Sequence, residues 1–179
     1  MKSPPEIARP TASEYSPYYD RYISLVPAGD VLQHLSAQIN STLAVLRGIT
    51  EAQSLRRYAP GKWSIKEVLG HVCDTERIMS YRALRLGRGD QTPLPGFDEN
   101  DYVKAGNCDV RAWADLIGEF ETIRAATVSL FRGFETAATE RLGTANNTAV
   151  SVRALAYIIA GHERHHLKVI QERYLPLLQ

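Results

Sequence analysis

Histidines at three positions are the residues of this chain best suited to chemistry. His162 and His166 lie in an apolar stretch that the sequence predicts to be a helix over about residues 151–173. Residues four apart in a helix point about 40° apart around its axis, so these two imidazoles can bind one metal ion. His165 is offset from the pair, and we expect it at the surface or behind the ligands.

The same segment also fits a motif of zinc proteases. The run His-Glu-Arg-His-His at 162–166 matches H-E-x-x-H, in which the glutamate, here Glu163, is the general base. Such proteases take a third ligand from downstream, but only thirteen residues follow His166, and Glu172 would lie on the opposite side of the same helix. The third ligand must therefore come from upstream.

Glu163 is a candidate base, and equally a candidate surface carboxylate.

His34 and His71 are the upstream candidates for the third ligand. His34 lies at the edge of an apolar stripe, near the start of a predicted helix. His71 lies in a helix whose start is fixed by a capping box of Ser64 and Glu67. It can face the interior, so we predict that His71 completes the metal site.

Helical periodicity predicts four long helices and almost no sheet. The first predicted helix covers about residues 30–49 and could extend toward residue 57, and the second covers about residues 64–86. The third begins after Asp109 as its N-cap, and the fourth covers about residues 151–173. A loop with Gly143, Asn146 and Asn147 leads to the last helix. The 179 residues are 44% hydrophobic, which suits one domain over 1–179 with a real core.

The positions of the histidines along their helices predict a crossed topology. His71 lies roughly 10 Å from the start of its helix, and the midpoint of His162 and His166 lies roughly 14 Å from the end of the last helix. These levels agree best if the two helices are antiparallel, whereas strict up-down-up-down connectivity would make them parallel. One connection should therefore cross the bundle, and residues 87–108 are the candidate. This long segment could also form a functional rim.

Residues 1–27 precede the predicted helices. They contain several prolines and a cluster of tyrosines. This composition predicts an ordered arm that packs across the bundle rather than a free tail. We expect residues 28–179 to form the bundle itself.

Charge and hydropathy exclude several function classes. Lysine and arginine number 21 against 20 acidic residues, with no basic block, so nucleic-acid binding is not expected. The first residues lack the apolar core of a signal peptide, and no apolar run could span a bilayer. We therefore expect a cytoplasmic protein without a membrane partner. Cys73 and Cys108 are too few for a disulfide framework, and Cys73 should point away from His71.

Charged residues of the second predicted helix are expected to be solvated. Asp74 and Glu76 are better placed as surface groups or neighbours of the ligands than as ligands. The arginines are expected to form a solvated face. Arg82 is the one among them that could instead meet an anionic substrate.

Three segments of the chain resemble the DinB/YfiT-like superfamily. They are Trp-Ser-Ile-Lys-Glu-Val-Leu-Gly-His at 63–71, Asp-Thr-Glu-Arg at 74–77 and Ala-Gly-His-Glu-Arg-His-His at 160–166. The resemblance implies a four-helix bundle with crossed topology, in which one histidine of the second helix and two of the last hold a divalent metal. It also implies kinship with bacillithiol S-transferases and, more distantly, with mycothiol-dependent enzymes. Dimers are common among such proteins, so a homodimer is a further expectation.

The predicted site leaves more than one reaction open. Three neutral imidazoles leave a free position on the ion, as in catalytic zinc sites, where a thiol can be deprotonated or water activated. The resemblance favours a thiol S-transferase that joins a small thiol to an electrophilic small molecule in detoxification or stress response. A metal-dependent hydrolase and a non-catalytic metal-binding module are the alternatives. Zinc or nickel is the expected ion, with iron and manganese as other candidates.

Overall fold

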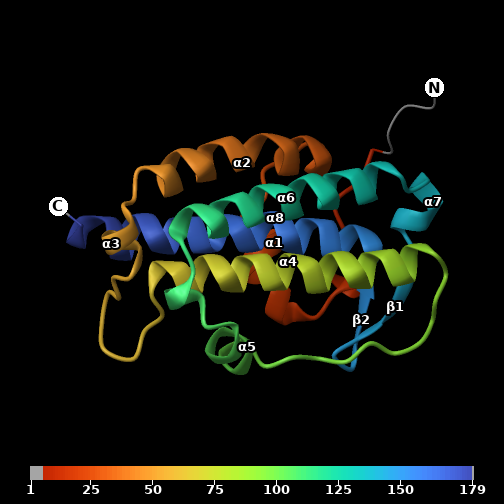
Figure 1. Cartoon of the computed structure of the whole chain (residues 1–179). Coiled ribbons are helices and arrows are strands. Elements are labelled where there is room, and N and C mark those ends of the chain that lie inside the picture. Colours follow the sequence, from red (N-terminus) through yellow and green to blue (C-terminus); the bar gives the residue numbers. More distant parts are fainter. Residues whose placement is uncertain (1–5, 179) are drawn as a thin grey trace.

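Four long helices lie side by side in the computed structural model, which describes residues 6–178 (Figure 1). They are α2 (Val31–Arg47), α4 (Ile65–Gly87), α6 (Trp113–Arg132) and α8 (Val152–Val169). The shorter helices are α1 (Asp20–Ile23), α3 (Glu51–Ser54), α5 (Glu99–Gly106) and α7 (Thr136–Thr139). Single turns cover Ala12–Glu14, Pro17–Tyr19, Cys108–Val110, Ile170–Tyr174 and Leu175–Leu177. The predicted all-α class and four-helix bundle are confirmed.

The chain crosses the bundle once, between α4 and α6. Figure 1 shows that α4 and α6 run in one direction and that α2 and α8 run in the other, so α4 and α8 are antiparallel. The connection from Gly87 to Cys108 returns along the length of the bundle, as predicted. This connection is not a plain loop, however, because α5 forms within it. The carboxylate of Asp98 caps α5 by accepting from the backbone N–H groups of Asn100 and Asp101.

Local capping explains where the long helices begin. Asp30 caps α2, and the predicted capping box of Ser64 and Glu67 starts α4. The prediction that Asp109 caps the third long helix was wrong, because α6 starts after Ala112. Asp109 lies in the preceding turn, where its carboxylate accepts from the side chains of Ser64 and Arg57.

A hairpin replaces the loop predicted before the last helix. Strands β1 (Leu142–Ala145) and β2 (Thr148–Ser151) pair antiparallel. Asn146 and Asn147 both have left-handed backbones, with φ of 51° and 60°, which suits the tight two-residue turns of hairpins. The backbone of Leu94 exchanges hydrogen bonds with this hairpin, donating to Thr144 and accepting from Asn146. The hairpin therefore fastens the segment that crosses the bundle.

The N-terminal arm is ordered over residues 6–27, as predicted, while its residues 1–5 lie outside the described part of the chain. Ile7 and Ile23 are buried in the core. The carboxylate of Glu14 accepts hydrogen bonds from Arg153 of α8, with the Nε donor 2.7 Å away. The main chain of Tyr22 in α1 lies directly against Gly161 of α8.

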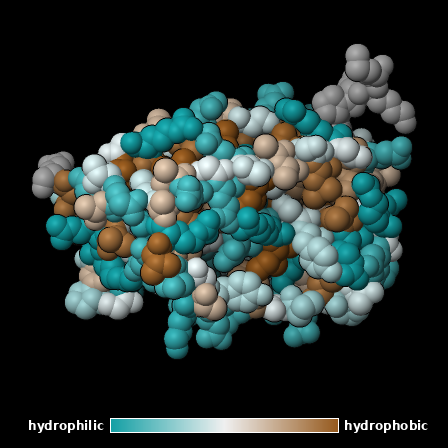
Figure 2. All heavy atoms as spheres, viewed as in Figure 1, coloured by the Kyte–Doolittle hydropathy of each residue, from teal (hydrophilic) through white to brown (hydrophobic). Residues whose placement is uncertain are grey.

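The surface view shows one face of the molecule on which hydrophilic side chains predominate and hydrophobic ones form small separate patches (Figure 2). No helix among residues 6–178 combines the length and the apolar character needed to cross a membrane.

Gly161 is predicted to be essential for docking the arm. A Cβ atom at Gly161 would lie 2.0 Å from the carbonyl oxygen of Tyr22, so the backbones of α1 and α8 would have to separate. We expect Gly161→Ala to lower the free energy of unfolding by about 3 kcal/mol in urea titrations. Gly118 is the matched control, since a Cβ there meets nothing within 4 Å, and Gly118→Ala should stabilise α6 by up to about 1 kcal/mol. Equal effects of the two substitutions would contradict this account.

Candidate metal centre

The three predicted ligands come together between α4 and α8. One ligand nitrogen each of His71, His162 and His166 lies within 4.8 Å of the others. Nε2 of His162 is 2.9 Å from Nε2 of His71 and 3.1 Å from Nε2 of His166. His71 and His162 are only 4% and 5% exposed. The helical spacing of four and the antiparallel pairing of α4 with α8 thus produce one compact group of imidazoles.

The other two histidines lie outside this group. Nε2 of His34 is 3.1 Å from the carbonyl oxygen of Ala28, at an exposed position. His165 is half-buried, and its ring packs edge-on against Tyr22 at 5.4 Å. The structure therefore separates His34, the other upstream candidate, from the predicted site.

Burial makes the three imidazoles neutral. It lowers the pKa of His71 to about 4, with a smaller contribution from the charge of His165. Burial, together with the neighbouring histidines, also lowers the pKa of His162 and of His166 well below the ordinary value. At neutral pH all three rings therefore have a lone pair available for a metal ion.

The donor set fits a divalent ion. A single N–H group of His162 cannot donate good hydrogen bonds to both neighbouring nitrogens. Lone pairs from three nitrogens, in contrast, can all point at one cation. Nitrogens about 2.0–2.1 Å from a tetrahedral zinc would be roughly 3.3 Å apart, close to the shorter separations found here. Neutral imidazoles suit zinc, nickel and iron alike, so this geometry favours a divalent metal without selecting one.

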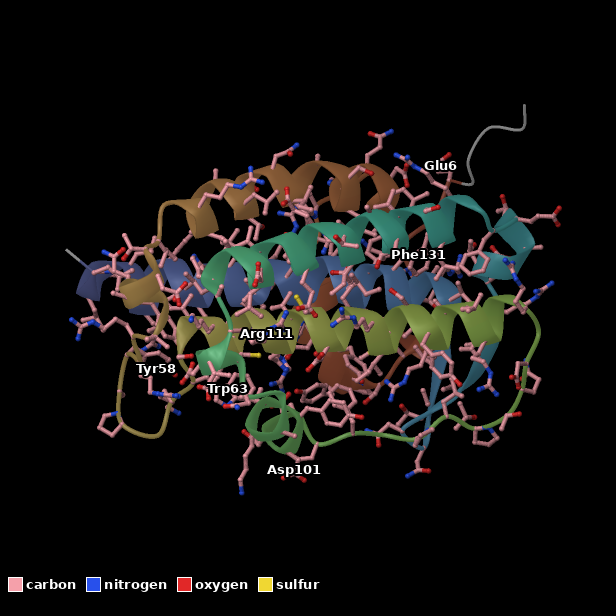
Figure 3. All side chains as sticks on the ribbon, viewed as in Figure 1. Glu6, Tyr58, Trp63, Asp101, Arg111 and Phe131 are labelled. Atoms are coloured by element: carbon pink, nitrogen blue, oxygen red, sulfur yellow. The ribbon has the colours of Figure 1, made fainter. Side chains whose placement is uncertain are left out.

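Aromatic rings enclose the imidazoles. The ring of Trp63, just before α4, lies 4.9 Å from that of His71. Tyr22, from the N-terminal arm, packs edge-on against His162 at 5.2 Å. Figure 3 shows Trp63 on the side of α4 that faces α5. Trp63 was not among the predicted site residues, so its contact with the site is an addition from the structure.

Two cavities flank the histidines. His71 and His162 border a cavity of about 350 Å³, beneath the arm and the crossing segment. His166 borders a second cavity of about 300 Å³, together with Trp63. Asn100 of α5 lines both cavities. The segment predicted as a functional rim therefore does border the candidate site.

Glu163 is engaged in a buried network of charges. Its carboxylate accepts from Thr42 and from Arg124, each at 2.6 Å, and from Gln38. Arg124 also donates to both carboxylate oxygens of Glu76, at 2.9 and 2.8 Å. Burial alone would lower the pKa of Arg124, but the two carboxylates raise it overall.

This network changes two expectations from the sequence. Glu76 was expected either at the surface or beside the ligands, and its 2% exposure excludes the surface position. Both oxygens of Glu163 are occupied by hydrogen bonds, which favours a structural role for it over that of a base. Arg124 was missed, although a lone arginine four residues after Phe120, inside the apolar stripe of its helix, was a signal for a buried ion pair.

Sequence and fold both match known proteins over most of the chain. A family model described as DinB superfamily matches residues 34–170, which include all three histidines. The chain belongs to the DinB superfamily. An Oceanobacillus iheyensis protein named "Putative metal-dependent hydrolase OB0413" is 25% identical over 142 residues, which cover 78% of this chain and 81% of that protein.

A solved structure has the same fold. It is YfiT from Bacillus subtilis, described as a probable metal-dependent hydrolase with an unusual four-helix bundle topology. The two structures superpose with a TM-score of 0.69 at 17% sequence identity, over 95% of this chain and 93% of YfiT. The predicted membership of the DinB/YfiT-like superfamily is confirmed.

The first prediction for this site concerns metal content. Elemental analysis of protein purified without an affinity tag should find about one divalent ion per chain. His162→Ala should reduce this to background, because two imidazoles hold an ion far more weakly than three. His34→Ala is the matched control and should keep the full content. Equal metal content in the two variants would show that the ion is held elsewhere.

The second prediction separates a structural Glu163 from a catalytic one. Glu163→Gln leaves Arg124 with one buried carboxylate in place of two, so the free energy of unfolding should fall by about 3 kcal/mol. The control is Glu121→Gln, which removes a pair with Arg47 whose side chains are 60% and 40% exposed, and it should cost less than about 1 kcal/mol. Unchanged stability of Glu163→Gln in urea titrations, with loss of activity, would instead favour a base.

Proposed function

We propose that this protein is a divalent-metal-dependent enzyme and that it transfers a small thiol to an electrophilic small molecule. His71, His162 and His166 would hold the ion. The observation that carries the proposal is the convergence of three neutral imidazoles, two of them buried and that of His166 half-buried, between two cavities. Such a ligand set belongs to catalytic rather than structural metal sites.

An ion with three neutral ligands keeps its full charge and lowers the pKa of a thiol or water at its free position. The chain's own residues supply the conditions for this. Burial keeps the imidazoles unprotonated, and the rings of Trp63 and Tyr22 restrict access of water to them. In the transfer, sulfur forms a bond to carbon of the electrophile, the thiol proton passes to solvent, and the leaving group departs with the electron pair of its broken bond.

Two features favour thiol transfer over hydrolysis. Two organic substrates need two binding volumes beside the ion, and cavities of about 350 and 300 Å³ flank the histidines. Glu163, the base expected for hydrolysis from the H-E-x-x-H motif, has its hydrogen bonds directed to Thr42 and Arg124 instead. A thiol, in contrast, is acidic enough to ionise beside a metal without a base.

Metal-dependent hydrolysis is the second candidate. It is favoured by the description of YfiT as a probable metal-dependent hydrolase and by the name of the Oceanobacillus protein. A non-catalytic metal-binding module of stress response is the third. The cytoplasm as the place of action and a homodimer as the working form stay predictions; the two free, buried cysteines agree with a reducing compartment.

A thiol panel tests the proposed reaction. Metal-loaded protein is mixed with 1-chloro-2,4-dinitrobenzene and, in turn, with bacillithiol, mycothiol, glutathione and cysteine. We expect thioether formation with at least one thiol, in amounts equal to the thiol consumed. His162→Ala should reduce the rate at least about 100-fold, because the ion is lost, while His34→Ala should leave it unchanged.

Two results would contradict the transferase. Turnover of the electrophile without any thiol would point to the hydrolase. A fully metal-loaded protein that processes no electrophile, with any thiol of the panel or with water, would point to the non-catalytic module.

A further inference from the structure

One face of α4 lines the larger cavity from the metal centre to its far end. The residues on this face are His71, Thr75, Met79 and Arg82, and all four border the cavity of about 350 Å³. Their spacing of four, four and three residues keeps them on one side of the helix. His71 and Arg82 are about 16 Å apart along the helix axis, and helical side chains lean toward the N-terminus, so the guanidinium leans toward His71.

Arg82 is a buried cation without a counter-ion. It is 3% exposed, which contradicts the expected solvated position. One Nη donates to the carbonyl oxygen of Pro95 at 2.6 Å, and the other lies 3.6 Å from the sulfur of Met79. Among the ion pairs within residues 6–178, none involves Arg82, whereas the equally buried Arg124 has two carboxylate partners. A buried charge without an opposite charge is costly, so a negative ligand group would stabilise Arg82.

Thr75 supplies a second unsatisfied group in the same cavity. Its side chain is 4% exposed, and its hydroxyl oxygen has no hydrogen-bond partner in the described part of the chain. It lies between His71 and Arg82 on α4. Buried hydroxyl groups nearly always have a partner, so a free one that lines a cavity points to a ligand.

The charges around the cavity select the kind of ligand. Asp98 and Glu99 border it from the crossing segment, and their negative charge disfavours an anion at that end. Arg82 is the one lysine or arginine among the described residues that line it, and His71 and His162 are neutral. A single positive charge matches the single negative charge of a carboxylate better than the double charge of a phosphate.

We propose that Arg82 and Thr75 bind a carboxylate of the substrate whose other end reaches the histidines. The inference rests on the proposed function, since it treats the histidines as the reacting end. The guanidinium donates charge-assisted hydrogen bonds to the carboxylate, and the Thr75 hydroxyl donates another. The substrate is therefore an elongated acid that lies along α4.

Matched pairs of thiols test this site without an activity assay. Zinc-loaded protein is titrated by calorimetry with ω-mercaptoalkanoic acids of three to eight carbons and with the corresponding ω-mercaptoalcohols. We expect at least one acid to bind about tenfold or more tightly than its alcohol, the gain typical of a hydrogen bond to a charged group. Arg82→Gln should abolish this preference and leave the affinity for the alcohol unchanged.

Controls separate Arg82 from general effects. Arg85→Gln, on the same helix but outside the cavity, should keep the preference. Arg82→Lys should retain part of it, and Thr75→Val should lower it a few-fold, so the assignment stays testable if Arg82→Gln does not fold. Equal affinities of acids and alcohols for the wild type, or a preference that survives Arg82→Gln, would overturn the assignment.

The outcome is distinguishable from failure of the proposed function. An Arg82-dependent preference in a protein that turns over no thiol would keep the carboxylate site and reject the transferase. Thiol transfer without any preference for acids would keep the transferase and reject the carboxylate site.

Discussion

Three imidazoles from two helices must be uncharged, at least partly buried, and still face one another. Nitrogens 2.9 and 3.1 Å apart would repel strongly if more than one ring were protonated. Burial removes that charge, and one divalent cation would satisfy all three lone pairs. Three features of the fold produce this arrangement. They are the antiparallel pairing of α4 and α8, the connection that crosses the bundle, and the arm that covers His162.

A second interaction fixes the four long helices at the level of the site. Glu76 of α4 and Glu163 of α8 both pair with Arg124 of α6, and Gln38 and Thr42 of α2 donate to Glu163. Each long helix thus contributes to one buried polar network. Its central carboxylate belongs to Glu163, the residue that follows the ligand His162. Breaking one partner out of a buried network of this kind leaves an unpaired buried charge, so the network favours one register of the helices. The precision of the imidazole cluster follows from that register.

Much of this arrangement could be predicted from the sequence, because periodicity and spacing are local signals. The helix of His71, its capping box, the pair His162 and His166 and the crossed connection all follow from such patterns. The pairing of charged side chains between helices could not be predicted. The buried pairing of Arg124, the burial of Arg82 and the hydrogen bonds of Glu163 depend on which helix faces which. Asn146 and Asn147 were noted, but a turn of two asparagines makes a hairpin only when both flanking segments can pair.

We infer that one divalent ion is held by imidazoles from two helices. The decisive measurement is anomalous X-ray diffraction from crystals of protein purified without an affinity tag. The data are collected at the absorption edge of the metal found in the protein. We expect one anomalous peak per chain, at bonding distance from Nε2 of His71, His162 and His166. A peak on other residues, or rings turned apart with no peak in active protein, would contradict it.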